Sequence, residues 1–159
     1  SNGGHVAFDP NYRAKGWISA ADARSEIERL APYISAILPT REDDDDLFGP
    51  ASIEQHIKRW QAAGIDEVVL KCGAEGAWVA SPGDDLRHVP AESGRPVIDT
   101  SGAGDSFNAA YITARLAGAA PAAAAAAGNY LASFVIGHRG SVLPRHAMPG
   151  NGQSAPKTL

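Results

Sequence analysis

The feature that most constrains the fold is a series of short apolar runs separated by segments with helical periodicity. The runs lie at residues 5–8, 34–38 and 66–71, and the intervening helical patterns begin at Ser19 and Ser52. Strands that alternate with helices in this order form a parallel sheet covered by helices. Apolar runs without alternation are typical of strands buried on both faces. We therefore predict an α/β fold with a mostly parallel central sheet.

Local signals give the boundaries of the other predicted elements. Ser19 is the expected N-cap of the first helix, and Ser52 with Gln55 three residues later forms a capping-box pattern at the second. The acidic run 43–46 is interpreted as a local acidic cluster. The second half of the chain predicts short strands at 77–80, 87–90 and 95–98, followed by helices at about 103–116 and 121–136.

Composition excludes several classes of function. The net charge of −4 argues against a nucleic-acid-binding protein, which usually carries a basic face. Cys72 is the single cysteine and excludes an internal disulfide, so we expect a reducing, cytoplasmic setting. No apolar run is long enough to span a bilayer, and no signal peptide opens the sequence.

Residues 99–105 form the most informative segment. A predicted strand ends just before it and a predicted helix follows, and Gly102 and Gly104 allow the backbone to approach a ligand closely. Backbone N–H groups at such a helix start bind anions. Asp105 then lies in the first helical turn, where a carboxylate is suited to accept a proton from an attacking hydroxyl. The alternative is that Asp105 only complements the helix dipole.

The complete string Asp-Thr-x-Gly-Ala-Gly-Asp-x-Phe resembles the C-terminal signature of the ribokinase-like (PfkB) carbohydrate kinases. The resemblance implies a ribokinase-like three-layer sandwich of which only the C-terminal portion is present. It also implies roles for individual residues: Asp105 as catalytic base and substrate contact, Gly102, Ala103 and Gly104 as the anion hole, and Asp99 and Thr100 as support for the loop and the nucleotide phosphates.

The resemblance runs from Phe8 to about Pro144, and it implies that residues 1–148 are the C-terminal part of a kinase domain. The tail 149–159 is expected to be disordered. Members of the family are longer, so an N-terminal half of the same enzyme is expected as the missing partner of this chain. Two hypotheses follow: the chain is a fragment of an active kinase, or it is a nucleotide-binding domain without catalysis. No membrane partner is expected, and the sequence leaves open whether the chain forms a homo-oligomer.

The resemblance also implies an ATP site. The segment Lys71-Cys72-Gly73-Ala74-Glu75-Gly76 resembles the strand and Gly-x-x-Gly turn that lie against ATP in the family. Lys71 either reaches a phosphate or ends its strand in solvent. Asn129 either reads the adenine or lies on a helix surface, and the alanines at 122–127 have a simpler explanation in close helix packing.

Mg²⁺ is expected because ATP phosphates need a counter-cation, and a monovalent cation is a further expectation. The family commonly carries Asn-x-x-Glu after the strand that ends here at Leu38-Pro39. In this chain Thr40 replaces the Asn and Asp43 replaces the Glu. Asp43 or Glu42 is therefore a candidate for water-mediated metal contact, and the alternative is a solvated acidic helix start.

The acceptor side is carried by Asp9-Pro10-Asn11-Tyr12-Arg13, which resembles the 2-keto-3-deoxygluconate kinases within the family. Asn11 and Arg13 are implied to bind the substrate, with the Arg13 guanidinium meeting the carboxylate of a sugar acid. The alternative acceptor is fructose or another neutral sugar. The segment 137–141 also resembles this subgroup, and its His138 and Arg139 either approach the site or cap the preceding helix. The other four histidines show no ligand spacing and are expected to be structural or exposed: His5, His56, His88 and His146.

Overall fold

The computed structural model describes residues 4–144 and 147–149. The chain divides into two units, one formed by Ser1–Gly73 with Trp78–His88 and the other by Ala74–Ala77 with Val89–Leu159. The expectations for His146 and for most of the C-terminal tail lie outside the described residues.

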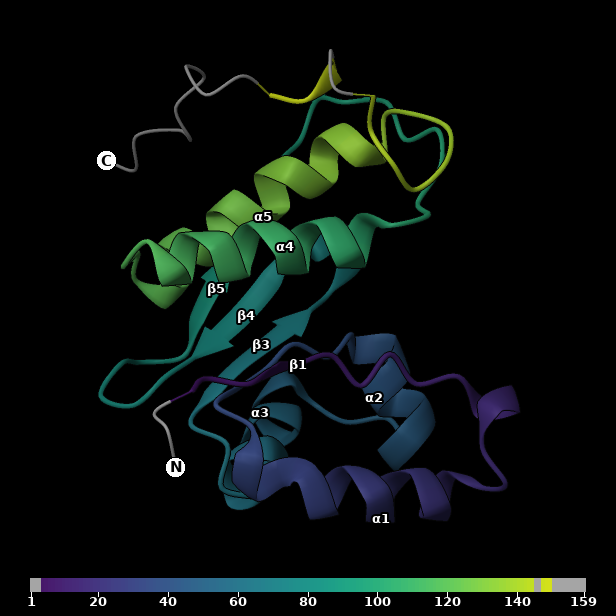
Figure 1. Cartoon of the computed structure of the whole chain (residues 1–159), viewed down its shortest axis with the longest axis vertical. Helices are drawn as coiled ribbons and strands as arrows, with labels where there is room; N and C mark the ends of the chain where they lie inside the picture. Colours follow the sequence, from purple (N-terminus) through teal and green to yellow (C-terminus); the bar gives the residue numbers. More distant parts are fainter. Residues whose placement is uncertain (1–3, 145–146, 150–159) are drawn as a thin grey trace. The chain divides into compact units, whose positions relative to one another are not determined.

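A five-stranded sheet has the order β1-β2-β3-β4-β5. Figure 1 labels four of its strands, β1, β3, β4 and β5. Both β1 and β3 pair with β2 in parallel, which confirms the predicted parallel arrangement. The side chains of Val68, Val69 and Leu70 on β3 are fully buried, as expected for a strand covered on both faces. The strands are β1 (Ala7–Phe8), β2 (Ala36–Ile37), β3 (Glu67–Lys71), β4 (Ala77–Ala80) and β5 (Arg87–Val89).

The α-helices in the described part of the first unit are α1 (Ala20–Leu30), α2 (Arg41–Phe48) and α3 (Ile53–Ala62). Ser19 caps α1 through the backbone N–H of Asp22, and Ser52 and Gln55 form the predicted capping box at α3. Short 3-10 turns lie at Ala14–Gly16, Ala31–Tyr33 and Gly73–Glu75. The side chains of Ser19 and Ser52 thereby accept hydrogen bonds from backbone N–H groups that have no partner within the first helical turn.

Helix α2 forms where the sequence predicted an acidic cluster, with an acidic helix start as the alternative. Thr40 caps it by accepting from the backbone N–H of Asp43. Asp44 and Leu47 turn inward and are each 1% exposed, so the expectation of a solvated acidic helix start was wrong for Asp44. The apolar core that receives this helix includes Ile37 and Trp60.

The second unit contains α4 (Ala103–Leu116) and α5 (Pro121–Val135), which pack against one another (Figure 1). A Cβ on Gly128 would lie 2.7 Å from the ring of Phe107, so the two helices need a glycine at this point. Ala124 and Ala125 are fully buried. The burial of these two alanines agrees with the close helix packing predicted for the alanine-rich run.

The strand predicted at residues 95–98 was wrong. This segment is irregular, because Pro96 has no backbone N–H and Ile98 and Asp99 both donate to the carbonyl of Ile136 instead of to a strand. The guanidinium of Arg95 lies 3.5 Å from the ring centroid of Phe134. Within the described part of the chain, no helix is long and apolar enough to cross a membrane.

Candidate functional site

The turn at residues 99–105 has the geometry of an anion-binding helix start. Gly102 is the N-cap residue of α4 with φ 76°, in the left-handed region, and no side chain caps this helix. The backbone N–H of Ala103 donates to the carbonyl of Thr100, which closes the turn. Asp105 lies exposed in the first turn of α4. An uncapped, glycine-led helix N-terminus is suited to a phosphate or another anion.

Asp99 holds the start of this turn. Its Oδ1 accepts from the backbone N–H of Ser101 and its Oδ2 accepts from the backbone N–H of Gly140, both at 2.9 Å. These hydrogen bonds, that from Gly140 first and then those from Ser101, lower the pKa of the Asp99 carboxyl to about 2. Asp99 is therefore a structural clamp between the turn and the segment after α5.

We expect the Asp99 carboxyl to titrate near pH 2, below its ordinary value of 3.8. Because the folded state binds this proton more weakly than the unfolded state, the stabilisation is complete above about pH 4 and is lost as the pH falls toward 2. Carboxyl-detected NMR on the folded chain measures this titration directly. A midpoint near 4 would contradict the clamp, and Asp99→Asn should flatten the acid limb of the stability curve.

Gly102 also allows a close backbone approach. A Cβ at this position would lie 2.7 to 2.9 Å from the Cβ, carbonyl oxygen and Cα of Ser141. The turn and the segment 137–141 thus lie side by side. The helix-capping alternative holds for His138, whose Nδ1 lies 2.9 Å from the carbonyl oxygen of Phe134.

Gly102→Ala is expected to destabilise the second unit more than Gly118→Ala. Gly118 has φ +87° and nothing within 4 Å of its Cβ position, so its substitution measures backbone strain alone, about 1–2 kcal/mol. The contact with Ser141 should add about 1–3 kcal/mol at Gly102. Denaturant unfolding followed by circular dichroism compares the two variants, and equal losses would show that the close approach costs nothing.

Asn129, the predicted adenine contact, is buried on α5. Its Nδ2 donates to the carbonyls of Val89 and Pro90, at 3.0 and 2.9 Å. Both amide hydrogens are therefore used to hold the chain that follows β5, and Asn129 is no surface residue. Any contact with a base would have to use its Oδ1.

The predicted Gly-x-x-Gly turn forms the 3-10 turn Gly73–Glu75. Gly76 follows with φ +95°, and a Cβ there would collide with the backbone of residues 89–91. Gly73 has φ +54° and open space around it. Gly76 is thus required by backbone packing, whereas Gly73 is exposed and has nothing within 4 Å of its Cβ position.

At the carboxyl end of the sheet, Lys71 forms an ion pair with Asp9. Lys71 ends β3 and Asp9 follows β1, and Nζ lies 2.7 Å from Oδ2. The Lys71 side chain is only 8% exposed, so the alternative that it ends its strand in solvent was wrong. Ligands usually bind at this edge of a parallel sheet.

Arg13 and Asp43 form a second ion pair in the same unit, with Nη1 2.8 Å from Oδ1. Nη1 also donates to the carbonyl of Tyr12 at 2.7 Å. Both contacts use Nη1, so the Nε and Nη2 edge of the fork has no partner among the described residues. Asn11 precedes this arginine with φ 40°, the left-handed conformation that among described non-glycine residues occurs here alone. The loop thus presents an exposed cation, whose side chain is 67% accessible.

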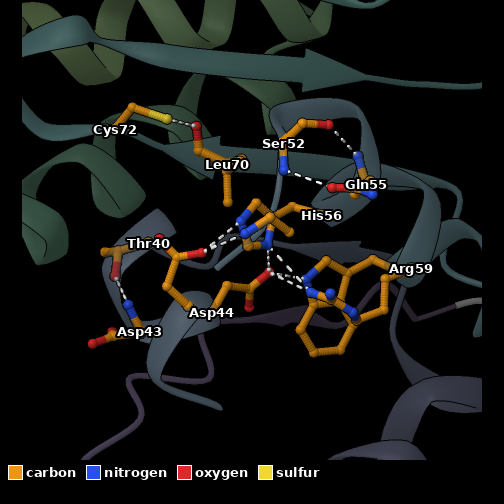
Figure 2. A network of polar contacts seen from close by, with 12 residues as sticks. Thr40, Asp43, Asp44, Ser52, Gln55, His56, Arg59, Leu70 and Cys72 are labelled. Atoms are coloured by element: carbon orange, nitrogen blue, oxygen red, sulfur yellow. Dashed lines mark hydrogen bonds and ion pairs between the residues drawn. The ribbon is translucent and has the colours of Figure 1, made fainter. Parts of the chain in front are cut away.

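A buried polar network behind this edge escaped the sequence analysis (Figure 2). Oδ2 of Asp44 accepts from Nε1 of Trp60 at 2.9 Å and lies 3.2 Å from Nδ1 of the fully buried His56. Nε2 of His56 lies 3.0 Å from Oδ1 of Asp45, without the alignment of a hydrogen bond. Burial raises the pKa of the Asp44 carboxyl to about 6, against the hydrogen bond from Trp60 and the charges of His56 and Arg59. His56 is thus a buried structural residue, and of the two expectations, structural or exposed, the first holds for it.

The donor set at the sheet edge fits a metal ion that keeps most of its waters. Among residues 4–144 and 147–149, no group of three or more His, Cys, Asp or Glu side chains is placed to hold one. Asp43 offers a carboxylate at the sheet edge, although its Oδ1 is engaged by Arg13. A single carboxylate fits Mg²⁺, which usually keeps several waters and binds through one or two carboxylates and substrate phosphates.

Three comparisons place these features among known proteins. The profile of the pfkB family carbohydrate kinases matches residues 1–148. The chain is 40% identical over 151 residues to 2-dehydro-3-deoxygluconokinase of Escherichia coli K12, which covers 94% of the chain and 49% of that protein. The chain thus spans about half the length of the curated relatives it matches.

Solved structures confirm the expected ribokinase-like fold class. An E. coli protein proposed to be a ribokinase II, in complex with ATP and Mg²⁺, matches 88% of the chain with a TM-score of 0.76 and 26% identity, over 44% of its own length. Fructokinase from Vibrio cholerae O395, with fructose, ADP and calcium bound, matches 87% of the chain with a TM-score of 0.75 and 28% identity, over 46% of its own length.

Proposed function

Because the chain belongs to the pfkB family of carbohydrate kinases, we propose that it is the nucleotide-binding and catalytic-base half of an ATP-dependent 2-keto-3-deoxygluconate kinase. The observation that carries this proposal is the uncapped start of α4, where Gly102 adopts a left-handed conformation and Asp105 stands exposed in the first turn. A helix start of this kind binds phosphate, and its carboxylate is free to act as a base.

In the proposed reaction, the primary hydroxyl of the sugar acid attacks the γ-phosphorus of ATP. A new O–P bond forms, the bond to the β–γ bridging oxygen breaks, and ADP leaves with that electron pair. The hydroxyl proton passes to the carboxylate of Asp105. Backbone N–H groups of Gly102, Ala103 and Gly104 would stabilise the charge that develops on the transferred phosphoryl group.

Other residues would hold the substrates. Lys71 is proposed for a phosphate, Gly73 for close backbone approach to the nucleotide, and Asp99 and Thr100 for support of the turn. Asn129 would contribute its carbonyl oxygen to the base, and Asn11 would contact the sugar acid. Mg²⁺ would supply counter-charge to the ATP phosphates, with Asp43 holding it through water. A monovalent cation completes the proposed set.

The acceptor assignment rests on Arg13. Its fork has a Nε and Nη2 edge suited to bidentate binding of a carboxylate, and it is exposed at the carboxyl end of β1. The identity of 40% to 2-dehydro-3-deoxygluconokinases supports the same acceptor class. A neutral-sugar kinase is the second candidate, supported by the fructose-bound fructokinase among the structural neighbours.

Arg13→Ala is expected to raise KM for 2-keto-3-deoxygluconate by about 10- to 150-fold, because charge-assisted hydrogen bonds are worth about 1.5–3 kcal/mol. KM for fructose and for ATP should change little. Steady-state kinetics with both acceptors measures the selectivity. Arg29→Ala is the matched control, since Arg29 is an exposed arginine on α1 that pairs with Glu26. An equal rise in KM for acid and neutral acceptors would rule out the contact between Arg13 and the carboxylate and would favour the neutral-sugar kinase.

A further inference from the structure

The buried network on α2 and α3 is larger than packing alone requires. Asp44 and His56 are 1% and 0% exposed, and Asp44 takes the indole N–H of Trp60. An apolar side chain would hold α2 against the core without the cost of burying a carboxylate. A buried carboxylate fixes the rotation of the helix about its axis, because its hydrogen bonds form at only one orientation of the helix.

The orientation of Asp44 also fixes the orientation of Asp43, the residue before it on α2. Successive side chains on an α-helix point about 100° apart, since the helix has 3.6 residues per turn. With Asp44 fixed toward α3, Asp43 is turned toward Arg13, which it reaches at 2.8 Å. Thr40 ties the same turn to the sheet, since its Oγ1 accepts from the N–H of Asp43 and its backbone bridges to Lys71.

Arg13 has little else to orient it. It lies outside the regular strands, two residues after the left-handed Asn11, and its side chain is 67% exposed. Asp43 is the one carboxylate that contacts it among the described residues, and its other contact is the carbonyl of Tyr12. If α2 rotated or shifted, the guanidinium would lose its ionic partner.

We propose that Asp44, His56 and Trp60 are positioning residues, which fix the orientation of Arg13 through Asp43. The side chains of the network are almost fully buried, so they would act on a substrate through Arg13 and not by contact. The consequence for acceptor recognition rests on the proposed function: the network sets how the Nε and Nη2 edge of Arg13 meets the sugar-acid carboxylate. Loss of the network should then weaken binding of acids and leave neutral sugars and ATP unaffected.

The test follows the Arg13 side chain directly, by the steady-state heteronuclear NOE of its Nε–Hε group in the folded chain, assigned with Arg13→Lys. Trp60→Phe removes the indole donor and keeps an aromatic ring, and His56→Gln is a second variant in case the first folds poorly. Asp43→Asn gives the reference value for a released Arg13. Leu47→Ala is the matched control, because Leu47 is a buried residue of α2 outside the network.

We expect Trp60→Phe and His56→Gln to lower the NOE of Arg13 toward the Asp43→Asn value, with Leu47→Ala close to wild type. Asp44→Asn should retain the wild-type value, since its amide oxygen still accepts from Trp60. Unchanged NOEs in both network variants, or in Asp43→Asn itself, would overturn the proposal. A loss in Leu47→Ala equal to that in the network variants would also overturn it, because general loosening of α2 would then suffice.

Kinetics on the same variants separates this inference from the proposed function. Trp60→Phe should raise KM for 2-keto-3-deoxygluconate about tenfold, the equivalent of one lost hydrogen bond of about 1.4 kcal/mol, with kcat and KM for fructose nearly unchanged. If the Arg13 NOE falls and the acid KM stays constant, the positioning role stands and the assignment of Arg13 to the sugar acid fails.

Discussion

Asp105→Asn is expected to reduce kcat by about 10²- to 10⁴-fold, the usual contribution of a positioned general base. The amide keeps the size of the carboxylate and cannot take the hydroxyl proton. The start of α4 depends on Gly102 and on the hydrogen bonds of Asp99, so the turn should keep its shape. The Kd for ATP, measured by isothermal titration calorimetry, should therefore change little while single-turnover phosphorylation slows.

The control for this substitution is Asp66→Asn, at an exposed aspartate in the turn before β3. Neutralising it changes the net charge by the same amount and should leave kcat within a factor of about two, as surface substitutions usually do. If Asp105→Asn kept full activity, the assignment of Asp105 as the catalytic base would be wrong. A parallel loss of ATP affinity would instead indicate that the carboxylate serves the fold of the turn.

Asp44→Ala is expected to lower the free energy of unfolding of the first unit by about 3–5 kcal/mol, because it leaves the buried indole N–H of Trp60 without its acceptor and removes the carboxylate beside His56 and Arg59. Denaturant unfolding followed by circular dichroism measures the loss. His56→Ala and the double variant should show strong coupling, since both residues belong to one network.

Asp46→Ala is the matched control, because Asp46 is exposed on the same helix and differs from Asp44 in burial rather than in type. Its effect should stay within about 0.5 kcal/mol. If the two aspartates gave equal losses, the account of Asp44 as a buried structural carboxylate would be wrong.

The sequence predicted the elements whose signals are local. Helix α4 begins and ends at the predicted residues 103 and 116, since a glycine turn and a following Gly118 mark its ends within a few positions. The capping box of Ser52 and Gln55 is equally local. These features depend on neighbours in the chain, so one sequence contains the information they need.

Features that depend on distant partners were missed. Asp44 lies in a run of four aspartates, and only its hydrogen bond with Trp60, sixteen residues away, makes its burial tolerable. Lys71 and Asp9 are separated by 62 residues, and only strand pairing brings them together. The segment 95–98 failed for a related reason, because the carbonyl of Ile136 takes the hydrogen bonds that a strand would need.

The sequence named candidate residues for the site, but it did not predict the contacts that hold them in place. The structure gives the glycine turn the left-handed N-cap that anion binding needs, and it pairs Arg13 with Asp43, which no motif suggested. It also commits the Asn129 amide to two backbone carbonyls. The roles of these residues toward ATP and the sugar acid stay proposals.

The most direct measurement of the central claim is ³¹P NMR of the products formed from ATP, Mg²⁺ and 2-keto-3-deoxygluconate, by this chain and by a form extended at its N-terminus. We predict one equivalent of ADP and a phosphate monoester on the primary hydroxyl of the sugar acid, at least in the extended form. ATP binding without ester formation in either form, or phosphorylation of fructose in preference to the acid, would contradict the account.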